Sequence, residues 1–156
     1  MIVNMEKYFF TIIVTMGLIA GLTSISLNQE IFAETAKNNT VVIANTEQEK
    51  KHLEIFDNLD FNAWNRQNWT LFAEIHAPNV LVVDFDGNAT RGIDDHIKWA
   101  KGFFSVYPDS KLVAHPIKIA IGDWSVVTGV DNTNSTMLTL AHWKDNRIIE
   151  EYLFSQ

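Results

Sequence analysis

The chain has 156 residues, of which 47% are hydrophobic and 20% are charged, which is typical of a globular domain rather than a disordered chain. Its 12 basic and 19 acidic residues give a net charge of −7, which argues against nucleic-acid binding, because phosphate contacts need clustered Lys and Arg. The sequence contains no cysteine, so disulfides, zinc–thiolate sites and thiol nucleophiles are excluded.

The first part of the chain has the pattern of a secretory signal peptide. The uncharged, apolar stretch Tyr8–Ala20 follows Lys7, and smaller residues come after it. We expect cleavage after Ala33, so that residues 1–33 are removed and the protein is secreted or otherwise extracytoplasmic. The alternative is an uncleaved membrane anchor that leaves the domain facing outside, because Tyr8–Leu27 is just long enough to span a bilayer.

A polar N-terminal arm, residues 34–48, is expected to precede a single folded domain of residues 49–156. Apolar residues at three- and four-residue steps predict a helix from Glu47 to about Asn65, with Thr46 as its N-cap and Glu49 three residues further on. The same spacing predicts a second helix over residues 69–77, ended by a proline, and a third over residues 94–106.

Short β-branched runs predict the strands, one before the third helix and four after it. Their expected ranges are 80–85, 112–121, 124–130, 136–144 and 147–154. Gly122-Asp123 and Asp145-Asn146 are expected to form tight two-residue hairpin turns. Three helices followed by an antiparallel meander predict an α+β fold in which a curved sheet wraps the helices.

Four ionisable residues interrupt the otherwise apolar rows of these strands. Residues two apart share one face of a strand, and on that basis the interruptions are Asp84, His115, His142 and Glu150. Burying an unpaired polar group costs about 2–7 kcal/mol, so we expect the sheet to enclose a pocket where these groups lie together. The alternative is that the rows face solvent, or that each histidine is a paired core residue.

If the pocket is catalytic, His115 or His142 is the expected base, because imidazole titrates near neutral pH. Asp84 or Glu150 would orient that base or act as the acid. A carbonyl-containing or otherwise apolar small molecule would lie against aromatic side chains, for which we select Phe104, Trp124, Trp143 and Tyr152.

The other histidines are expected elsewhere, and no metal or cofactor is expected. His52 and His96 fall on predicted helix surfaces and should be solvated, whereas His76, beside Pro78, could be buried or exposed. His115, His142 and a carboxylate could make a two-histidine metal site, but no pair of ligands has the local spacing that supports one. Glycine-rich phosphate loops and calcium loops are also absent from the sequence.

The order of these motifs resembles the SnoaL-like branch of the nuclear transport factor 2-like superfamily, which includes polyketide cyclases and proteins labelled ester cyclases. The segment Thr90–Asp94 enters a helix, Tyr107–Asp109 precedes a strand, and His142–Phe154 is similar to the last hairpin of the family. His115–Lys118 and Trp124–Val130 also fit the ester cyclase-like subgroup. The resemblance covers residues 53–154.

The resemblance implies a cone-shaped α+β fold with a pocket between sheet and helices, often dimeric through the sheet, and no required cofactor or metal. In the polyketide cyclases an Asp in the pocket acts as general acid and base in an intramolecular aldol closure. That Asp corresponds here to Leu153, which cannot transfer a proton, and the hairpin at Asp131–Ser135 is shorter than in relatives.

Two hypotheses about function follow from different classes. The first is a secreted domain whose apolar pocket binds a small hydrophobic ligand or a partner, and the missing Asp favours it. The alternative is a cofactor-independent cyclase, isomerase, lyase or hydrolase that uses pocket histidines and carboxylates, and the polar interruptions favour that one.

Overall fold

A computed structural model describes residues 40–155 of the chain. The predicted signal peptide and residues 34–39 of the predicted arm lie outside the described residues. Within these residues, no helix is both long enough and apolar enough to cross a bilayer. The elements, in chain order, are β1 (Val41–Ile43), α3 (Glu47–Asn58), the π-helix η1 (Leu59–Trp64), α4 (Trp69–Ile75), β2 (His76–Val83), β3 (Ala89–Arg91), α5 (Ile93–Val106), β4 (Leu112–Ile121), β5 (Trp124–Asp131), β6 (Thr136–Lys144) and β7 (Arg147–Ser155).

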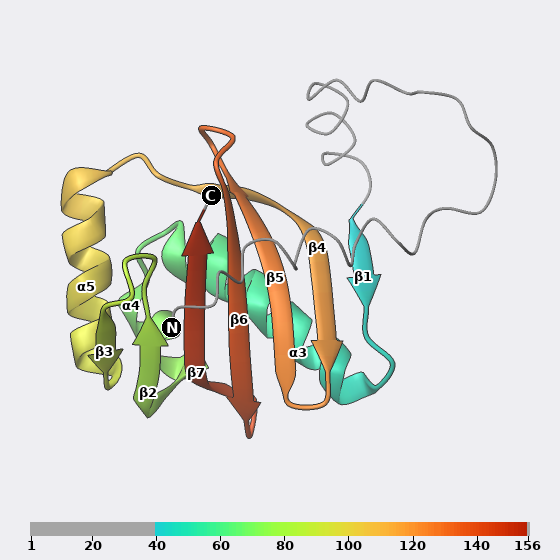
Figure 1. Ribbon diagram of the computed structural model, residues 1–156. Coiled ribbons are helices and arrows are strands. Elements are labelled where there is room, and N and C mark those ends of the chain that lie inside the picture. The colour runs from blue at the N-terminus through green and yellow to red at the C-terminus, as the bar shows by residue number, and fades with distance from the viewer. Residues whose placement is uncertain (1–39, 156) are drawn as a thin grey trace, which may run out of the picture.

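The predicted α+β class is confirmed: helices pack on one mixed sheet whose strand order is β1-β4-β5-β6-β7-β2-β3. The four strands β4 to β7 form the expected antiparallel meander, while β1 joins β4 and β2 joins β7 in parallel (Figure 1). The turn between β6 and β7 places Asp145 and Asn146 at φ of 50° and 60°, the pair of left-handed residues that a tight hairpin favours.

The first helix begins where the sequence indicates. The Thr46 Oγ1 accepts a hydrogen bond from the Glu49 backbone N (3.1 Å), and the Glu49 carboxylate accepts one from the Thr46 N (2.9 Å). These reciprocal bonds satisfy backbone donors that a helix N-terminus otherwise leaves unpaired. The same Glu49 side chain also accepts from the Gly122 N at 2.8 Å, which ties the start of α3 to the β4–β5 turn.

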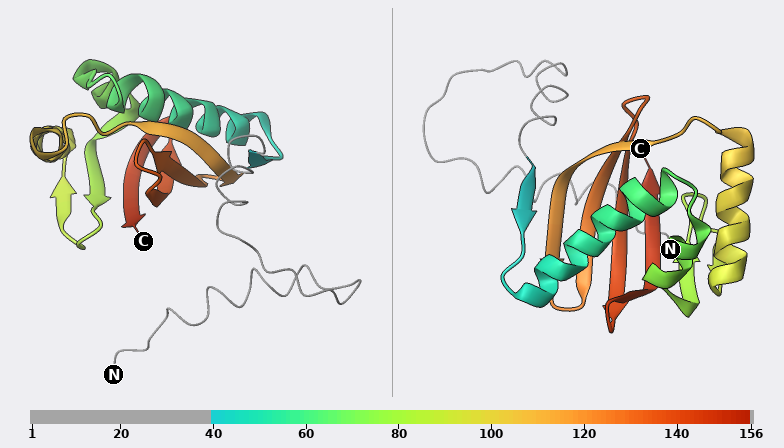
Figure 2. Two further views of the ribbon diagram at one scale, coloured as in Figure 1. Left: turned by 90° about the horizontal axis from the view of Figure 1, so that it is seen from above. Right: turned by 180° about the vertical axis from the view of Figure 1, so that it is seen from behind.

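The helices α3 and η1 cross one face of the sheet, and α5 lies beside the β2–β3 end (Figure 2). We call the face against the helices the inner face and the opposite one the outer face. The core lies between the layers, where Phe56, Val80, Trp143 and Ile148 are each at most 1% exposed. Burial of these large apolar side chains is the main driving force for this packing.

The largest difference from the predicted element boundaries is at the start of β2, which also ends at Val83 rather than at residue 85. The second helix ends at Ile75 rather than at residue 77, and β2 begins at His76. Pro78 explains the shift, because a proline pushes the preceding residue, Ala77, out of the helical region and into an extended conformation. Two short strands, β1 and β3, were not predicted, and β1 brings part of the expected arm into the sheet.

Candidate functional site

A register shift in β4 turns His115 to the inner face. Residues Val113 and Ile117, which alternation would put on the same face as His115, are 53% and 40% exposed, whereas His115 is 5% exposed. The pairing of β4 with β5 is irregular between Ala114 and Ile117, and there the Ile117 N donates to the Thr128 Oγ1 at 3.1 Å. His115 is therefore inside as expected, but a bulge puts it there rather than regular alternation.

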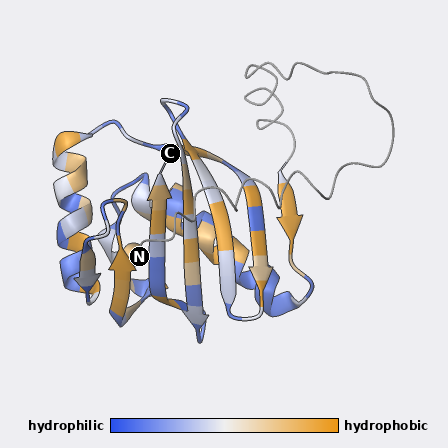
Figure 3. Ribbon diagram, viewed as in Figure 1, coloured by the Kyte–Doolittle hydropathy of each residue, from blue (hydrophilic) through white to orange (hydrophobic). Residues whose placement is uncertain are grey.

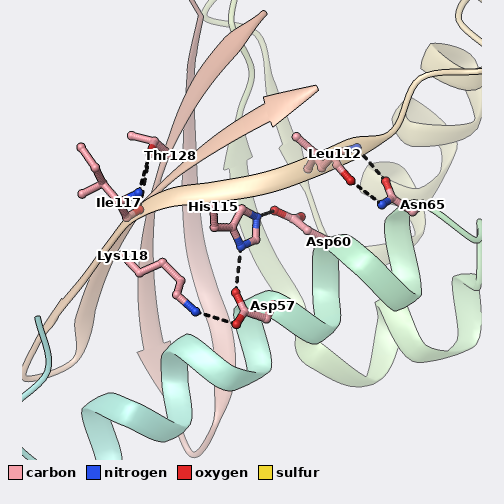
Figure 4. A network of polar contacts seen from close by, with 8 residues as sticks. All are labelled: Asp57, Asp60, Asn65, Leu112, His115, Ile117, Lys118 and Thr128. Atoms are coloured by element: carbon pink, nitrogen blue, oxygen red, sulfur yellow. Dashed lines mark hydrogen bonds and ion pairs between the residues drawn. The ribbon is translucent and has the colours of Figure 1, made fainter. Parts of the chain in front are cut away.

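Both ring nitrogens of His115 meet carboxylates that come from the helix layer (Figure 4). The Nδ1 lies 2.8 Å from the Asp57 Oδ1, and the Nε2 lies 2.8 Å from the Asp60 Oδ2. The Lys118 Nζ donates to the other oxygen of Asp57 at 2.6 Å. Of these four residues only His115 was selected as a site residue from the sequence, so its three partners are new.

The electrostatics of the network hold His115 in its charged form. Burial lowers the His115 pKa, but the hydrogen bonds to Asp57 and Asp60 outweigh it and raise the pKa to about 9. Burial also raises the pKa of Asp57, but the bonds from His115 and Lys118 outweigh it and hold that pKa below its ordinary value. For Asp60 the effect of burial wins, and its pKa is raised despite the bond from His115.

Two local features fix this geometry. Asp60 belongs to the π-helix η1, a rare helical form that is frequent at functional sites. One turn further on, the Asn65 side chain pairs with both backbone polar groups of Leu112: its Nδ2 donates to the carbonyl, and its Oδ1 accepts from the N–H, each at 2.8 Å (Figure 4). This clamp fixes the start of β4 against the helix layer, three residues before His115.

Asp60 also lines a cavity of about 1060 Å³ between the helices and the sheet. Most of the wall is apolar and aromatic, and it includes Leu59, Trp64, Phe72, Trp99, Phe103 and Leu153. Its ionisable lining includes Asp60, Asp84, His96 and Glu151. A hollow of this size, with an aromatic wall and a few convergent polar groups, is typical of a small-molecule site.

A second buried cluster adjoins the same cavity. The Glu151 Oε2 lies 3.4 Å from the His76 Nε2 and 3.8 Å from the His96 Nε2, and all three residues are buried. Burial lowers the pKa of His96 to about 4. Of the described residues, these three form the group whose side chains could hold a metal ion.

The predicted residue Asp84 lies at the rim of the cavity, just after the end of β2. Its Oδ2 accepts a hydrogen bond from the Trp99 Nε1 at 3.1 Å, and its Oδ1 accepts from the backbone N of Asp86 and of Asn88. Asp84 thus helps to position an aromatic wall residue, and it does not contact His115 through a hydrogen bond or an ion pair.

Four other predicted site residues gather on the outer face, which corrects the expectation that they share the pocket. Trp124 stacks on His142 with ring centroids 4.2 Å apart, the Glu150 Oε2 lies 3.7 Å from the His142 Nδ1, and the Tyr152 hydroxyl donates to Glu150. None of these four residues lines the cavity. The inner-face positions of β6 and β7 are instead Thr139, Ala141, Trp143, Glu151 and Leu153.

The two remaining aromatic residues predicted to bind a ligand are part of the core. Trp143 is 1% exposed, stacks on His52 and donates from its Nε1 to the Ser125 Oγ at 2.8 Å. Phe104 is buried and packs on Trp64, so it supports a wall residue without lining the cavity itself.

The prediction that His52 and His96 are solvated is wrong, because each is only 2% exposed. His52 faces the sheet through its contact with Trp143, and His96 lies between Phe72 and Trp99. His76, whose position the sequence left open, is fully buried. The apolar flank that each histidine presents to an aromatic ring explains how an imidazole can replace an apolar residue at these positions.

These features define a helix-covered, curved sheet with an inner cavity, the fold of the nuclear transport factor 2-like superfamily. The SnoaL-like domain family matches residues 60–150, more than half of the chain, and the chain belongs to that family. No curated protein matches the chain.

Solved structures show the same fold at low sequence identity. One from Jannaschia sp., provisionally named a SnoaL-like polyketide cyclase, is 21% identical, with a TM-score of 0.62 over 72% of this chain and 90% of its own. One from Agrobacterium tumefaciens, provisionally named an isomerase of the SnoaL-like family, is 15% identical, with a TM-score of 0.59 over 69% of this chain and 98% of its own. One from Kribbella flavida, provisionally named a ketosteroid isomerase, is 16% identical, with a TM-score of 0.57 over 69% of this chain and 79% of its own.

Proposed function

We propose that this SnoaL-like domain binds a small apolar molecule in the inner cavity and that Asp60 moves a proton to or from it. The observation that carries the proposal is that Asp60 belongs both to the cavity wall and to the His115 network. A buried carboxylate that a neighbouring imidazole orients beside an aromatic hollow is suited to proton abstraction next to a carbonyl group, the step that cyclases and isomerases share.

The family resemblance indicates an Asp at position 153 of the sheet, where this chain has Leu153. Leu153 lines the inner cavity from β7, and Asp60 supplies a carboxylate to the same cavity from the helix layer. The chain can therefore retain acid–base chemistry with the reactive group on another wall. Burial that raises the pKa of Asp60 supports this role, because a general base works best when its pKa approaches the working pH.

The Kemp elimination of 5-nitrobenzisoxazole tests this proposal without knowledge of the natural substrate. In this reaction a base removes one carbon-bound proton and the N–O bond breaks to give a coloured phenolate. We expect the purified protein to accelerate the reaction and Asp60→Asn to lower the rate at least tenfold, since a positioned base contributes roughly 10²–10⁴-fold. The matched control is Asp86→Asn. Asp86 lies at the cavity rim and its carboxylate makes no side-chain hydrogen bond, so this variant should keep the rate.

Binding of the fluorescent probe 1-anilinonaphthalene-8-sulfonate separates the two parts of the proposal. We expect the wild type and Asp60→Asn to bind it equally, and Leu153→Trp, which narrows the cavity, to bind it more weakly. Equal elimination rates in wild type and folded Asp60→Asn would overturn the acid–base role and leave a binding domain. Failure of the wild type to bind the probe would overturn the apolar pocket as well.

We also propose that the domain acts outside the cytoplasm, on the strength of the signal-peptide pattern around Tyr8–Ala20. Expression of the full chain in a secreting host tests this. A product in the medium with the mass of residues 34–156 supports cleavage after Ala33. A full-length product in the membrane fraction contradicts cleavage and supports an anchor.

A further proposal is that two copies pair through the outer faces of their sheets. Exposed apolar side chains lie along this face on three strands, with Ile117 at 40%, Ile121 at 67%, Trp124 at 38% and Phe154 at 53% exposed. Figure 3 shows how apolar residues run through β4, β5 and β7 of this layer. An apolar patch of this kind marks an interaction site in a globular protein, and a second copy can match it through a two-fold axis.

A further inference from the structure

Three side chains converge on one buried point beside the cavity, each from a different element. His76 is the first residue of β2, His96 lies in the first turn of α5, and Glu151 lies on the inner face of β7. One ligand atom from each, two ring nitrogens and a carboxylate oxygen, lies within 4.8 Å of the others. The exposed fractions of the side chains are 0%, 3% and 7%, so protein surrounds the cluster.

The separations suit a cation at the centre. The Glu151 Oε2 is 3.4 Å from the His76 Nε2 and 3.8 Å from the His96 Nε2. A tetrahedral ion about 2.1 Å from each ligand holds neighbouring ligand atoms about 3.4 Å apart. The two distances to Glu151 are therefore close to that value, and the two histidine nitrogens lie within 4.8 Å of each other.

The tautomer of His76 leaves a lone pair directed at this point. Its Nδ1 lies 2.7 Å from the Phe72 carbonyl oxygen, which only accepts, so the Nδ1 carries a proton and donates it. The Nε2 is fully buried and has no hydrogen-bond partner among the described residues. In a neutral ring that nitrogen is an acceptor, and it faces the carboxylate of Glu151, another acceptor. A cation between the two would satisfy both.

The surroundings position the rings as metal-ligating histidines are usually positioned. Such histidines are oriented through the ring nitrogen that does not bind the metal. Here Phe72 holds the Nδ1 of His76, and the Thr90 Oγ1 lies 3.4 Å from the Nδ1 of His96. His96 also stacks on Trp99 with an interplanar angle of 14°. Both Nε2 atoms are thereby directed at Glu151.

We propose that His76, His96 and Glu151 bind one divalent first-row transition-metal ion. Two imidazoles and one carboxylate suit zinc, iron or cobalt, whereas magnesium and calcium prefer oxygen ligands. His96 and Glu151 line the cavity, so the remaining coordination positions of the ion face the space where a small molecule would lie. This site shares no ligand with the Asp57, Asp60 and His115 network, although the charge of Glu151 helps to raise the pKa of Asp60. Its test measures metal binding alone, so the metal site can fail while the proposed acid–base role holds.

Cobalt(II) titration of the tag-free, chelator-treated protein tests the site, because Co²⁺ bound by nitrogen and oxygen has visible absorption bands. We expect one Co²⁺ per chain with an affinity in the micromolar range or tighter, displacement by Zn²⁺, and no displacement by an excess of Mg²⁺ or Ca²⁺. His96→Gln and Glu151→Gln should each weaken binding at least tenfold, since loss of even an outer partner costs about 10–100-fold. His142→Gln is the matched control, because it removes an imidazole beside a carboxylate on the outer face.

A second measurement on the unmodified protein covers the case in which the buried variants do not fold. Nitrogen–proton spectra of the five histidine rings should show Zn²⁺ at the Nε2 of two of them, with the proton retained on the Nδ1 of His76. Absence of Co²⁺ and Zn²⁺ binding by the wild type would overturn the proposal. The proposal would also be overturned if His142→Gln abolished metal binding, or if Zn²⁺ changed the ring signals of His115 or His142 only.

Discussion

The Nε2 of His115 lies 2.8 Å from the Oδ2 of Asp60, and an irregularity in each element brings the two residues together. His115 follows the register shift of β4, and Asp60 belongs to the π-helix that continues α3. Regular versions of these elements would present different side chains to one another. Bulges and π-helical turns both occur preferentially near functional sites, which supports the choice of this pair as the reactive centre.

Replacement of His115 should destabilise the protein through the charges that it leaves behind. In His115→Gln the carboxylate of Asp60, with a side chain 15% exposed, loses its charged partner. We expect the free energy of unfolding to fall by about 2–3 kcal/mol, which is less than the roughly 3–5 kcal/mol for a fully buried pair, because Asp57 is partly solvated and keeps Lys118. Urea denaturation measures this change.

The same substitution at His142 is the control for that experiment. Its Nδ1 is 3.7 Å from Glu150 without a hydrogen bond, and its side chain is 28% exposed. We expect His142→Gln to change the free energy of unfolding by less than about 1 kcal/mol, as for other weak surface pairs. Equal losses in the two variants would contradict a special role for the inner network.

The raised pKa of His115 predicts that alkaline pH destabilises the folded state. The pKa is about 9 in the folded protein and 6.5 for a free imidazole, so folding favours the protonated ring. The resulting stabilisation is fully present below pH 6.5 and is lost as the pH rises through about 9. It amounts to about 3 kcal/mol at most, from 1.36 kcal/mol for each unit of pKa difference.

Urea midpoints between pH 6 and pH 9.5 measure this effect, and His115→Gln isolates it. The wild type should lose stability across this interval more steeply than the variant, because the variant lacks the titrating ring. Asp57, Asp60 and Lys118 face His115 and remain in both proteins, so the difference between the two curves reports the imidazole. Parallel curves would show that His115 is not held protonated.

The sequence predicted most elements well because their signals are local. The Thr46–Glu49 capping box, the Asp145-Asn146 turn and the β-branched runs each depend on a few neighbouring residues, and each lies where it was expected. The sequence could not show which strand face is inner. Leu138 and Leu140 on the outer face are as apolar as Ala141 and Leu153 on the inner face, so alternation alone gave the wrong row for His142 and Glu150.

The rest of the site depends on contacts between distant segments. Asp57 and Asp60 meet His115 across more than fifty positions of sequence, and the β4 bulge that allows the contact has no local signal. A weak sign was present: Asp60 falls beside Leu59 at an apolar step of the first helix, where a carboxylate needs a buried partner. The cluster of His76, His96 and Glu151 had no comparable sign, because its members are far apart in the sequence.

The clamp between Asn65 and Leu112 should contribute measurably to stability. Asn65→Ala leaves the N–H and carbonyl of Leu112, which is 7% exposed, without their side-chain partner. We expect a loss of about 1–3 kcal/mol, the cost of leaving buried polar groups unpaired. Asn62→Ala removes a side chain that bonds only Asn58 within the helix layer, and it should cost less. A larger loss in Asn62→Ala by thermal or urea denaturation would argue against the clamp.

The proposed pairing of outer faces predicts that a charge placed there prevents self-association. Phe154→Lys puts an ammonium group into the apolar face of β7, where it would have to be desolvated in a dimer. We therefore expect the dissociation constant of the dimer to rise at least tenfold, which corresponds to a loss of about 1.4 kcal/mol in binding free energy. Val106→Lys is the matched control, because Val106 is 66% exposed at the end of α5, away from the sheet face. Sedimentation equilibrium over a range of protein concentrations gives the mass of each species. A wild type that stays monomeric at high concentration, or equal weakening by both substitutions, would rule out this interface.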